Sequence, residues 1–117
     1  MKYHYEDEDL KIIIFFPKKE GKLIANATII LKTVSYGLYT TKGFQIWHSS
    51  RFNERLQEPI NITPPTKQIS GRFLIQAFFE DKNKWYELEN FIYSAYLKAR
   101  QEKTIVKEDI NPNEIPI

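Results

Sequence analysis

A single helical pattern near the C-terminal end sets the architecture that this sequence can adopt. From residue 81 to about residue 102, apolar residues recur at spacings of three and four, the period of an amphipathic helix. Asp81 or Asn83 can cap its first turn. Phe91 and Tyr93 fall off the apolar stripe and predict a second contact, with either a partner chain or an extra part of the sheet. The stripe itself comprises Trp85, Leu88, Ile92, Ala95, Tyr96 and Ala99.

The other regular segments are typical of strands. Residues 23–34 alternate clearly, and the small side chains of Ala25 and Ala27 leave room for a helix to pack closely. Gly43 predicts a bulge within a strand. Short connections favour antiparallel pairing, so we predict an α+β fold: a twisted antiparallel sheet of about five strands, one C-terminal helix packed on it and an extended tail. The predicted strands span residues 10–17, 23–34, 38–47, 59–63 and 72–79.

The length of 117 residues suits one domain. We expect residues 1–9 to be a flexible acidic N-terminus, residues 10–102 to form the single domain and residues 103–117 to form an extended C-terminal tail. Residues 48–58 are polar and predict a mobile loop.

Charge is unevenly distributed along the chain. Residues 1–10 hold one Lys and four acids, residues 11–100 hold 14 Lys or Arg and seven acids, and residues 101–117 hold two Lys and four acids. The net charges are therefore −3, +7 and −2. A basic body with acidic ends is typical of a polyanion binder, although random clustering on a solvated surface would look the same.

Several functional classes lack support in the sequence. Cysteine is absent, which excludes disulfides and thiolate sites. His4 and His48 are the only histidines, and no nucleophile, acid–base pair or phosphate loop accompanies them, so we predict no enzyme, cofactor, metal site or small-molecule substrate. The acids at 6–9 lack the spacing of a calcium loop and fit a solvated tail better. Without a signal peptide or a long apolar run, we expect a soluble, cytoplasmic protein with no membrane association.

Basic and aromatic residues interleave near the centre of the chain, a mixture that can bind single strands because bases stack on rings while Lys and Arg neutralise phosphates. The alternative is that rings such as Trp47 lie in the core or in a dimer interface. The nucleic-acid-binding residues that we predict are Lys42, Trp47, Arg51, Phe52, Arg55 and Lys67.

Between residues 25 and 96 the order of features resembles the SpoVG family, small bacterial regulators that bind nucleic acid. The resemblance rests on an alternating strand (ATIIL), a glycine-led strand (GFQIW), the Ser50-Arg51 step, the Pro59-Ile60 step and a terminal helix ending in Tyr. It implies a twisted antiparallel sheet with a C-terminal helix, a homodimer formed through strands, and DNA or RNA binding near Arg51. The chain departs from the family at residues 47–49, and its segment 62–78 is longer than the family usually carries.

Two functions follow as expectations. The first is a non-enzymatic regulator that binds single-stranded DNA or RNA through a basic loop and forms a homodimer. The second is a protein–protein interaction or assembly module, such as a phage or accessory protein, whose exposed aromatic residues and strand edges recruit a protein partner without nucleic-acid binding.

Overall fold

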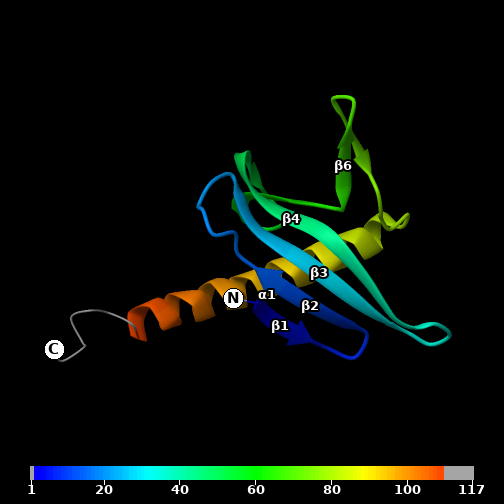
Figure 1. The fold of residues 1–117 in the computed structure, drawn as a ribbon, viewed down its shortest axis with the longest axis horizontal. Helices are drawn as coiled ribbons and strands as arrows, with labels where there is room; N and C mark the ends of the chain where they lie inside the picture. Colours follow the sequence, from blue (N-terminus) through cyan, green and yellow to red (C-terminus); the bar gives the residue numbers. More distant parts are fainter. Residues whose placement is uncertain (1, 110–117) are drawn as a thin grey trace.

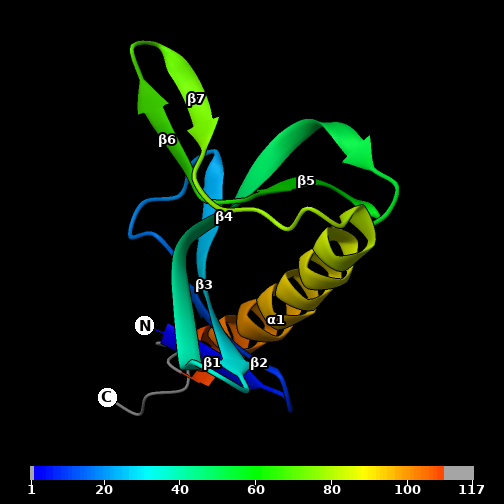
Figure 2. The same cartoon turned by 90° about the vertical axis from the view of Figure 1, so that its right-hand side faces the viewer.

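The computed structural model describes the backbone of residues 2–109 and the side chains of residues 2–104. Five strands pair in chain order as an antiparallel sheet, and one long helix crosses one face of it, so the predicted α+β class is confirmed (Figure 1). A two-stranded hairpin stands apart from this body (Figure 2). The sheet contains β1 (Lys2–Glu6), β2 (Leu10–Phe15), β3 (Leu23–Thr33), β4 (Gly37–Asn53) and β5 (Glu58–Thr63); the hairpin contains β6 (Thr66–Ile69) and β7 (Arg72–Ile75); the helix is α1 (Lys82–Asp109).

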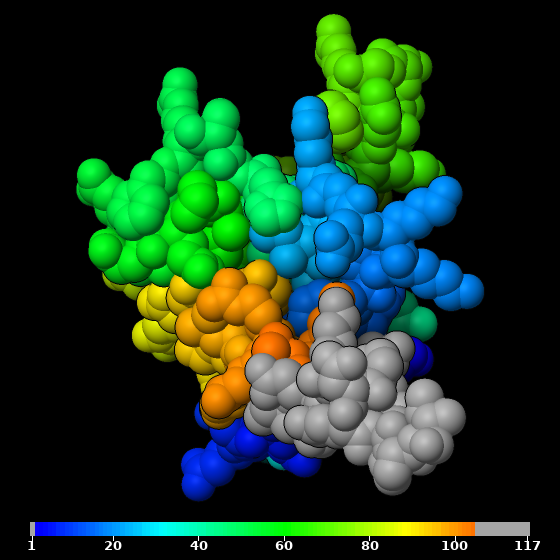
Figure 3. Space-filling model, turned by 90° about the vertical axis from the view of Figure 1, so that its left-hand side faces the viewer, coloured from blue at the N-terminus to red at the C-terminus, as the bar shows by residue number. Residues whose placement is uncertain are grey.

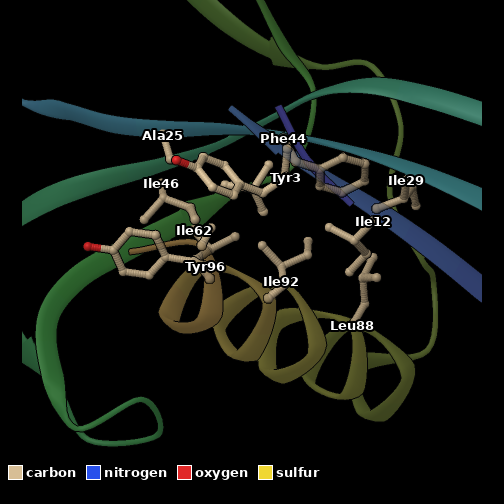
Figure 4. Packing of buried hydrophobic residues seen from close by; sticks show 14 of the residues in the cluster. Tyr3, Ile12, Ala25, Ile29, Phe44, Ile46, Ile62, Leu88, Ile92 and Tyr96 are labelled. Carbon is tan, nitrogen blue, oxygen red and sulfur yellow. The ribbon is translucent and has the colours of Figure 1, made fainter. Parts of the chain in front are cut away.

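The core lies between α1 and one face of the sheet. Side chains alternate between the two faces of a strand, so every second residue of β2 and β3 points at the helix. Ala25 and Ala27 are buried on this face, and Figure 4 shows Ala25, but β2 is the strand that the helix backbone approaches most closely. The larger residues around them are Ile12, Ile14, Ile29, Phe44, Ile46, Ile60 and Ile62.

The helix begins and packs as its pattern predicts. The Asp81 carboxylate accepts hydrogen bonds from the backbone N–H groups of Asn83 (2.8 Å) and Lys84 (3.4 Å), which caps the first turn. The predicted stripe is buried from Leu88 to Ala99, and Trp85 at its start is partly buried. The second contact is made with the sheet, because the Tyr93 hydroxyl donates to Glu58 of β5 at 2.8 Å.

A bulge at Gly43 changes the phase of β4. Ile29 pairs with Thr41, but Ala27 pairs with Phe44, so the strand contains one extra residue at Lys42–Gly43. Gly43 has a φ of +104°, in the region that favours glycine, and a Cβ there would lie 3.3 Å from the Cβ of Pro65. The predicted bulge is therefore present, and it brings the chain after β5 against β4.

The N-terminal segment is part of the sheet, which corrects the expectation of a flexible end at residues 1–9. Lys2–Glu6 pairs with β2 along its full length, and Tyr3 is buried in the core. The acidic run forms the turn that follows: the Asp7 carboxylate accepts hydrogen bonds from the N–H groups of Asp9 (2.9 Å) and Leu10 (3.0 Å). Sequence reasoning missed β1 because most of its residues are polar or charged and point away from the helix, and only Tyr3 is buried.

Three further boundaries differ from expectation. Residues 48–58 are not a loop throughout, because β4 continues to Asn53 and a four-residue turn leads into β5. Residues 72–75 pair with residues 66–69 in the separate hairpin instead of joining the main sheet. The helix runs to Asp109, so it includes the start of the predicted tail at 103–117; residues 110–117 lie outside the described part of the chain.

Burial at the helix–sheet contact predicts a large effect of truncation. Ile92 has 0% of its side chain exposed, so Ile92→Ala should lower the free energy of unfolding by about 2–5 kcal/mol through lost apolar burial and the cavity left behind. Chemical denaturation followed by tryptophan fluorescence measures this change. Val34→Ala is the control, since Val34 is fully exposed and its truncation should change stability by less than about 0.5 kcal/mol. Equal effects of the two substitutions would contradict the packing described.

Candidate nucleic-acid interface

The sheet face opposite the helix remains open. Ile46 and Ile62 are buried and point at the helix, so their neighbours Gln45, Trp47 and Asn61 point to the other side. The same alternation places part of β2 and β3 on this open face. The middle of the face is a hollow lined by Lys2, Ile13, Phe15, Asn26, Ala27, Thr28, Ile30, Thr40, Lys42 and Gly43.

Charge on the open face is predominantly positive. Lys2 and Lys42 line the hollow, and the β1–β2 register places Lys11 on the same side. Among the described side chains at the paired positions of this face, the one carboxylate is Glu6, at the end of β1. Its carboxylate lies 2.6 Å from the Lys32 ammonium, and this partner lowers the pKa of Glu6. The centre of the face therefore has lysines next to apolar and amide side chains.

Two aromatic residues of the face lie on different strands, Phe15 on β2 and Trp47 on β4. Phe15 lines the hollow with 36% of its surface exposed. Trp47 is half-buried and pairs with Asn61 of β5. Asn61 also borders a second hollow, at the end of β4, so the two parts of this surface are continuous. Ring faces next to lysines are the combination that single-stranded nucleic acid requires.

The predicted site residues fall into three groups. Lys42 and Trp47 lie on the open face, and Arg51, Phe52 and Arg55 line the hollow at the end of β4. Lys67 is not with them, because it lies on β6 opposite Leu74. The end of β4 projects next to the loop that joins β2 and β3, and the His48 N–H donates to the Lys22 carbonyl at 2.8 Å (Figure 3). Five of the six predicted residues thus share one continuous surface.

Arg55 is held by the helix. Its Nε and Nη2 donate to the Glu89 carboxylate at 3.1 and 3.4 Å, and its Cζ lies 4.6 Å from the centre of the Tyr86 ring. The hydrogen bond to Glu89 raises the pKa of the guanidinium. The Glu89 side chain is only 3% exposed, whereas that of Arg55 is 51% exposed. Arg55 therefore neutralises a buried carboxylate and fixes the β4–β5 turn on α1.

A second network fastens β5 to the helix. Glu58 accepts hydrogen bonds from the Tyr93 hydroxyl at 2.8 Å and from Arg100 at 3.1 Å. Burial and the hydrogen bond to Glu58 raise the pKa of Tyr93 to about 12, so its phenol stays protonated throughout the neutral range. These contacts and the Arg55–Glu89 pair hold the curled end of β4 in place, and thereby the position of Arg51 and Phe52.

No family model matches this sequence, and no curated protein or solved structure matches it either. The functional argument therefore depends on the geometry of the chain itself. Within the described residues, no helix is long and apolar enough to span a membrane, and no three His, Asp or Glu side chains are grouped so that they could hold a metal ion.

Sequence reasoning missed part of this surface. Lys2, Lys11 and Phe15 lie on the open face, but the sequence predicts a flexible end at residues 1–9 and assigns no face to the strand at residues 10–17. The alternation of Lys11, Ile13 and Phe15 with Leu10, Ile12 and Ile14 was a usable signal. The alternation is a weak signal because isoleucines of β2 lie on both faces of the sheet. Only the pairing of β2 with β1 and β3 shows which face each isoleucine takes.

Removing Arg55 should affect stability, and removing Arg51 should not. Arg55→Ala leaves the buried Glu89 carboxylate without its partner, which should lower the free energy of unfolding by about 1–3 kcal/mol. Arg51→Ala is the matched control, because its exposed side chain should be replaceable within about 0.5 kcal/mol. Urea denaturation of both variants measures the difference. If Arg55→Ala were as stable as the parent protein, the structural role given to this ion pair would be wrong.

Proposed function

We propose that this protein is a non-enzymatic nucleic-acid-binding regulator that holds single-stranded DNA or RNA on the open face of its sheet. The observation that carries the proposal is the composition of this face: Trp47 and Phe15 offer rings, Lys2, Lys11 and Lys42 offer ammonium groups, and the one carboxylate at its paired, described positions is already bound by Lys32. The resemblance to the SpoVG family points to the same activity.

Each group has a role in this proposal. Bases stack on Trp47 and Phe15, each stacked base contributing about 1–3 kcal/mol. Lys2, Lys42 and Arg51 contact phosphates. Neutral amides on the same face, such as Asn61, can donate to and accept from base edges. Arg55 makes no phosphate contact in this proposal, because its guanidinium is paired with the Glu89 carboxylate. Arg55 instead positions the end of β4, which presents Arg51 and Phe52.

The test is fluorescence anisotropy with labelled single-stranded DNA and RNA at about 50 and 200 mM salt. Binding should weaken steeply between these concentrations because phosphate contacts release counterions. Lys42→Ala should reduce the slope of log K against log salt by about 1. Lys84→Ala is the matched control: this exposed lysine lies on α1, pairs with Glu87 at 3.2 Å and should leave the slope unchanged.

Stacking is tested separately at Trp47. Trp47→Ala should weaken binding roughly 5- to 150-fold, the equivalent of one lost stack, while Trp47→Phe keeps a ring and should retain most of the affinity. Circular dichroism confirms that both variants are folded. If wild-type protein bound neither strand at the lower salt concentration, the proposal would be wrong.

An edge of β4 supports the homodimer that accompanies this function. Residues 37–42 of β4 pair only with β3, since β5 begins its pairing at Gln45. The outer backbone groups there are free to pair with a second copy, and Leu38 and Tyr39 beside them are more than half exposed. We propose that two copies join their β4 edges antiparallel.

A strand edge that pairs with another copy is blocked by proline, which has no N–H group to donate. Thr40→Pro should therefore convert a dimer to a monomer in sedimentation velocity, and Thr66→Pro at the start of the hairpin is the control. A dimer that survives Thr40→Pro would place the interface elsewhere. A wild-type monomer would remove the dimer from the proposal.

The interaction module remains the second candidate, because one observation favours it. The turn between β3 and β4 exposes Val34 and Tyr36 almost completely, and Leu38 is 70% exposed. Exposed apolar groups of this kind are typical of protein contacts. Under this alternative, Lys42→Ala leaves partner binding intact and Tyr36→Ala weakens it, the reverse of the pattern expected for nucleic acid.

A further inference from the structure

The β6–β7 hairpin is an exposed arm with an unusual charge. All eight of its strand residues are exposed, and Phe73 has 74% of its surface exposed. From Pro59 to Phe79 the sequence has no Asp or Glu, while Lys67 and Arg72 lie within the arm. A two-stranded ribbon is marginally stable alone in water, so an arm of this kind acquires stability from what it binds. The charge of the arm indicates that its partner is an anion.

The register of the arm sorts its side chains onto two faces. Lys67 pairs with Leu74 and Ile69 pairs with Arg72, and residues that pair directly lie on the same face. One face therefore alternates two cations with two aliphatic side chains. The other face holds Phe73 and Ile75 with the polar residues Thr66 and Gln68. Ser70 and Gly71 both have positive φ, at 49° and 77°, which gives the tight turn that keeps the tip of the ribbon narrow.

The base of the arm adjoins the open face of the sheet. The Gln76 N–H donates to the Pro65 carbonyl at 2.7 Å, which closes the hairpin at its root. Pro65 is buried against Gly43, and Lys42 next to it lines the hollow of the open face. Figures 2 and 3 show the arm extending from this point away from the helix. A nucleic acid held on the open face can therefore continue directly to the arm.

We propose that the β6–β7 arm enters a groove of double-stranded nucleic acid, so that the ligand of this protein is a junction between a single strand and a duplex. The inference rests on the proposed function of the open face and adds the duplex to it. The major groove of B-DNA is about 12 Å wide and admits a two-stranded ribbon. Lys67 and Arg72 contact phosphates at the groove walls. Phe73 and Ile75 provide apolar contact with base edges or a wedge between base steps, the use that nucleic-acid-binding arms make of such side chains.

Two occupants compete with duplex for an apolar arm: another protein and a membrane. Either could cover Phe73 and Ile75. A neutral surface does not explain why the 21 residues around the arm contain cations and no carboxylate, next to a face with lysines of its own. An anionic membrane would attract the same cations, so vesicles are included in the test. Charge complementarity over the arm and the adjoining face favours one continuous polyanion.

The experiment compares three labelled probes: a single strand, a blunt duplex and a duplex with a single-stranded tail. The wild-type protein should bind the tailed duplex at least about tenfold tighter than either other probe, because two linked contacts act together. In the excised variant, two glycines replace residues 66–75 between Pro65 and Gln76. The Pro65 carbonyl and the Gln76 N–H are already hydrogen-bonded, and with two glycines between them they become positions i and i+3 of a β-turn, so this excision closes without moving the sheet.

The excised variant should lose the advantage of the tailed duplex and keep its affinity for the single strand. Lys67→Ala with Arg72→Ala should reduce the salt slope for the tailed duplex by about 2, and Lys82→Ala with Lys84→Ala removes the same charge from α1 as the control. If the wild-type protein binds single strands but shows no preference for the tailed duplex, or if the excised variant keeps that preference, the arm proposal alone is wrong. If no probe binds, both proposals fail. Arm-dependent binding to phosphatidylglycerol vesicles without binding to duplex would also overturn the proposal.

Discussion

Close packing of α1 on the sheet is the contact on which the rest of the structure depends. Ala25 and Ala27 on β3 and Ala95 and Ala99 on the helix are almost completely buried in the same core, and β2 is the strand that the helix backbone approaches most closely. Larger side chains such as Ile12 and Ile92 fill the space between the two layers (Figure 4). With a single helix, only one sheet face can be covered in this way. The open face is a direct consequence of that limit.

The curl of β4 divides the molecule into its functional parts. The bulge at Gly43 lets the strand change direction, so its first half extends the flat sheet while its second half folds over the helix with β5. Arg55–Glu89 and Tyr93–Glu58 fix the folded half on α1. The same bulge accommodates Pro65 and thereby sets where the hairpin leaves the body. One glycine with a positive φ thus positions both the edge of the open face and the root of the arm.

Local signals predicted the parts of the fold that local physics determines. The helix, its Asp81 cap, the alternation around Ala25 and the bulge at Gly43 each depend on neighbouring residues, and all are present. The parts that were wrong depend on which neighbouring segment a strand pairs with. Residues 2–6 form a strand by pairing with the edge of β2, and residues 72–75 pair with residues 66–69 instead of with the main sheet. The charged residues of 2–6 weaken their strand signal, and the apolar residues of 72–75 give a strand signal that does not specify a partner.

The candidate site shows the same division. Lys42 and Trp47 could be selected from the mixture of basic and aromatic residues, but that mixture does not reveal that Glu89, 34 positions away, neutralises Arg55. The sequence also could not show that Lys67 belongs to a projecting arm instead of the sheet surface.

Because the helix covers only one face of the sheet, apolar side chains on the open face, such as Ile13, Ile30 and Phe15, remain partly exposed to water. This exposure lowers the stability of the fold. The β6–β7 hairpin adds to that cost with a ribbon that buries almost nothing. Both features are placed on one continuous surface, and both combine apolar groups with lysine or arginine. Folding alone does not account for this arrangement, because stability would favour apolar groups buried and carboxylates near the cations. Under the proposed function, an anionic ligand with apolar faces, such as stacked bases on a phosphate chain, contacts both halves of the surface at once.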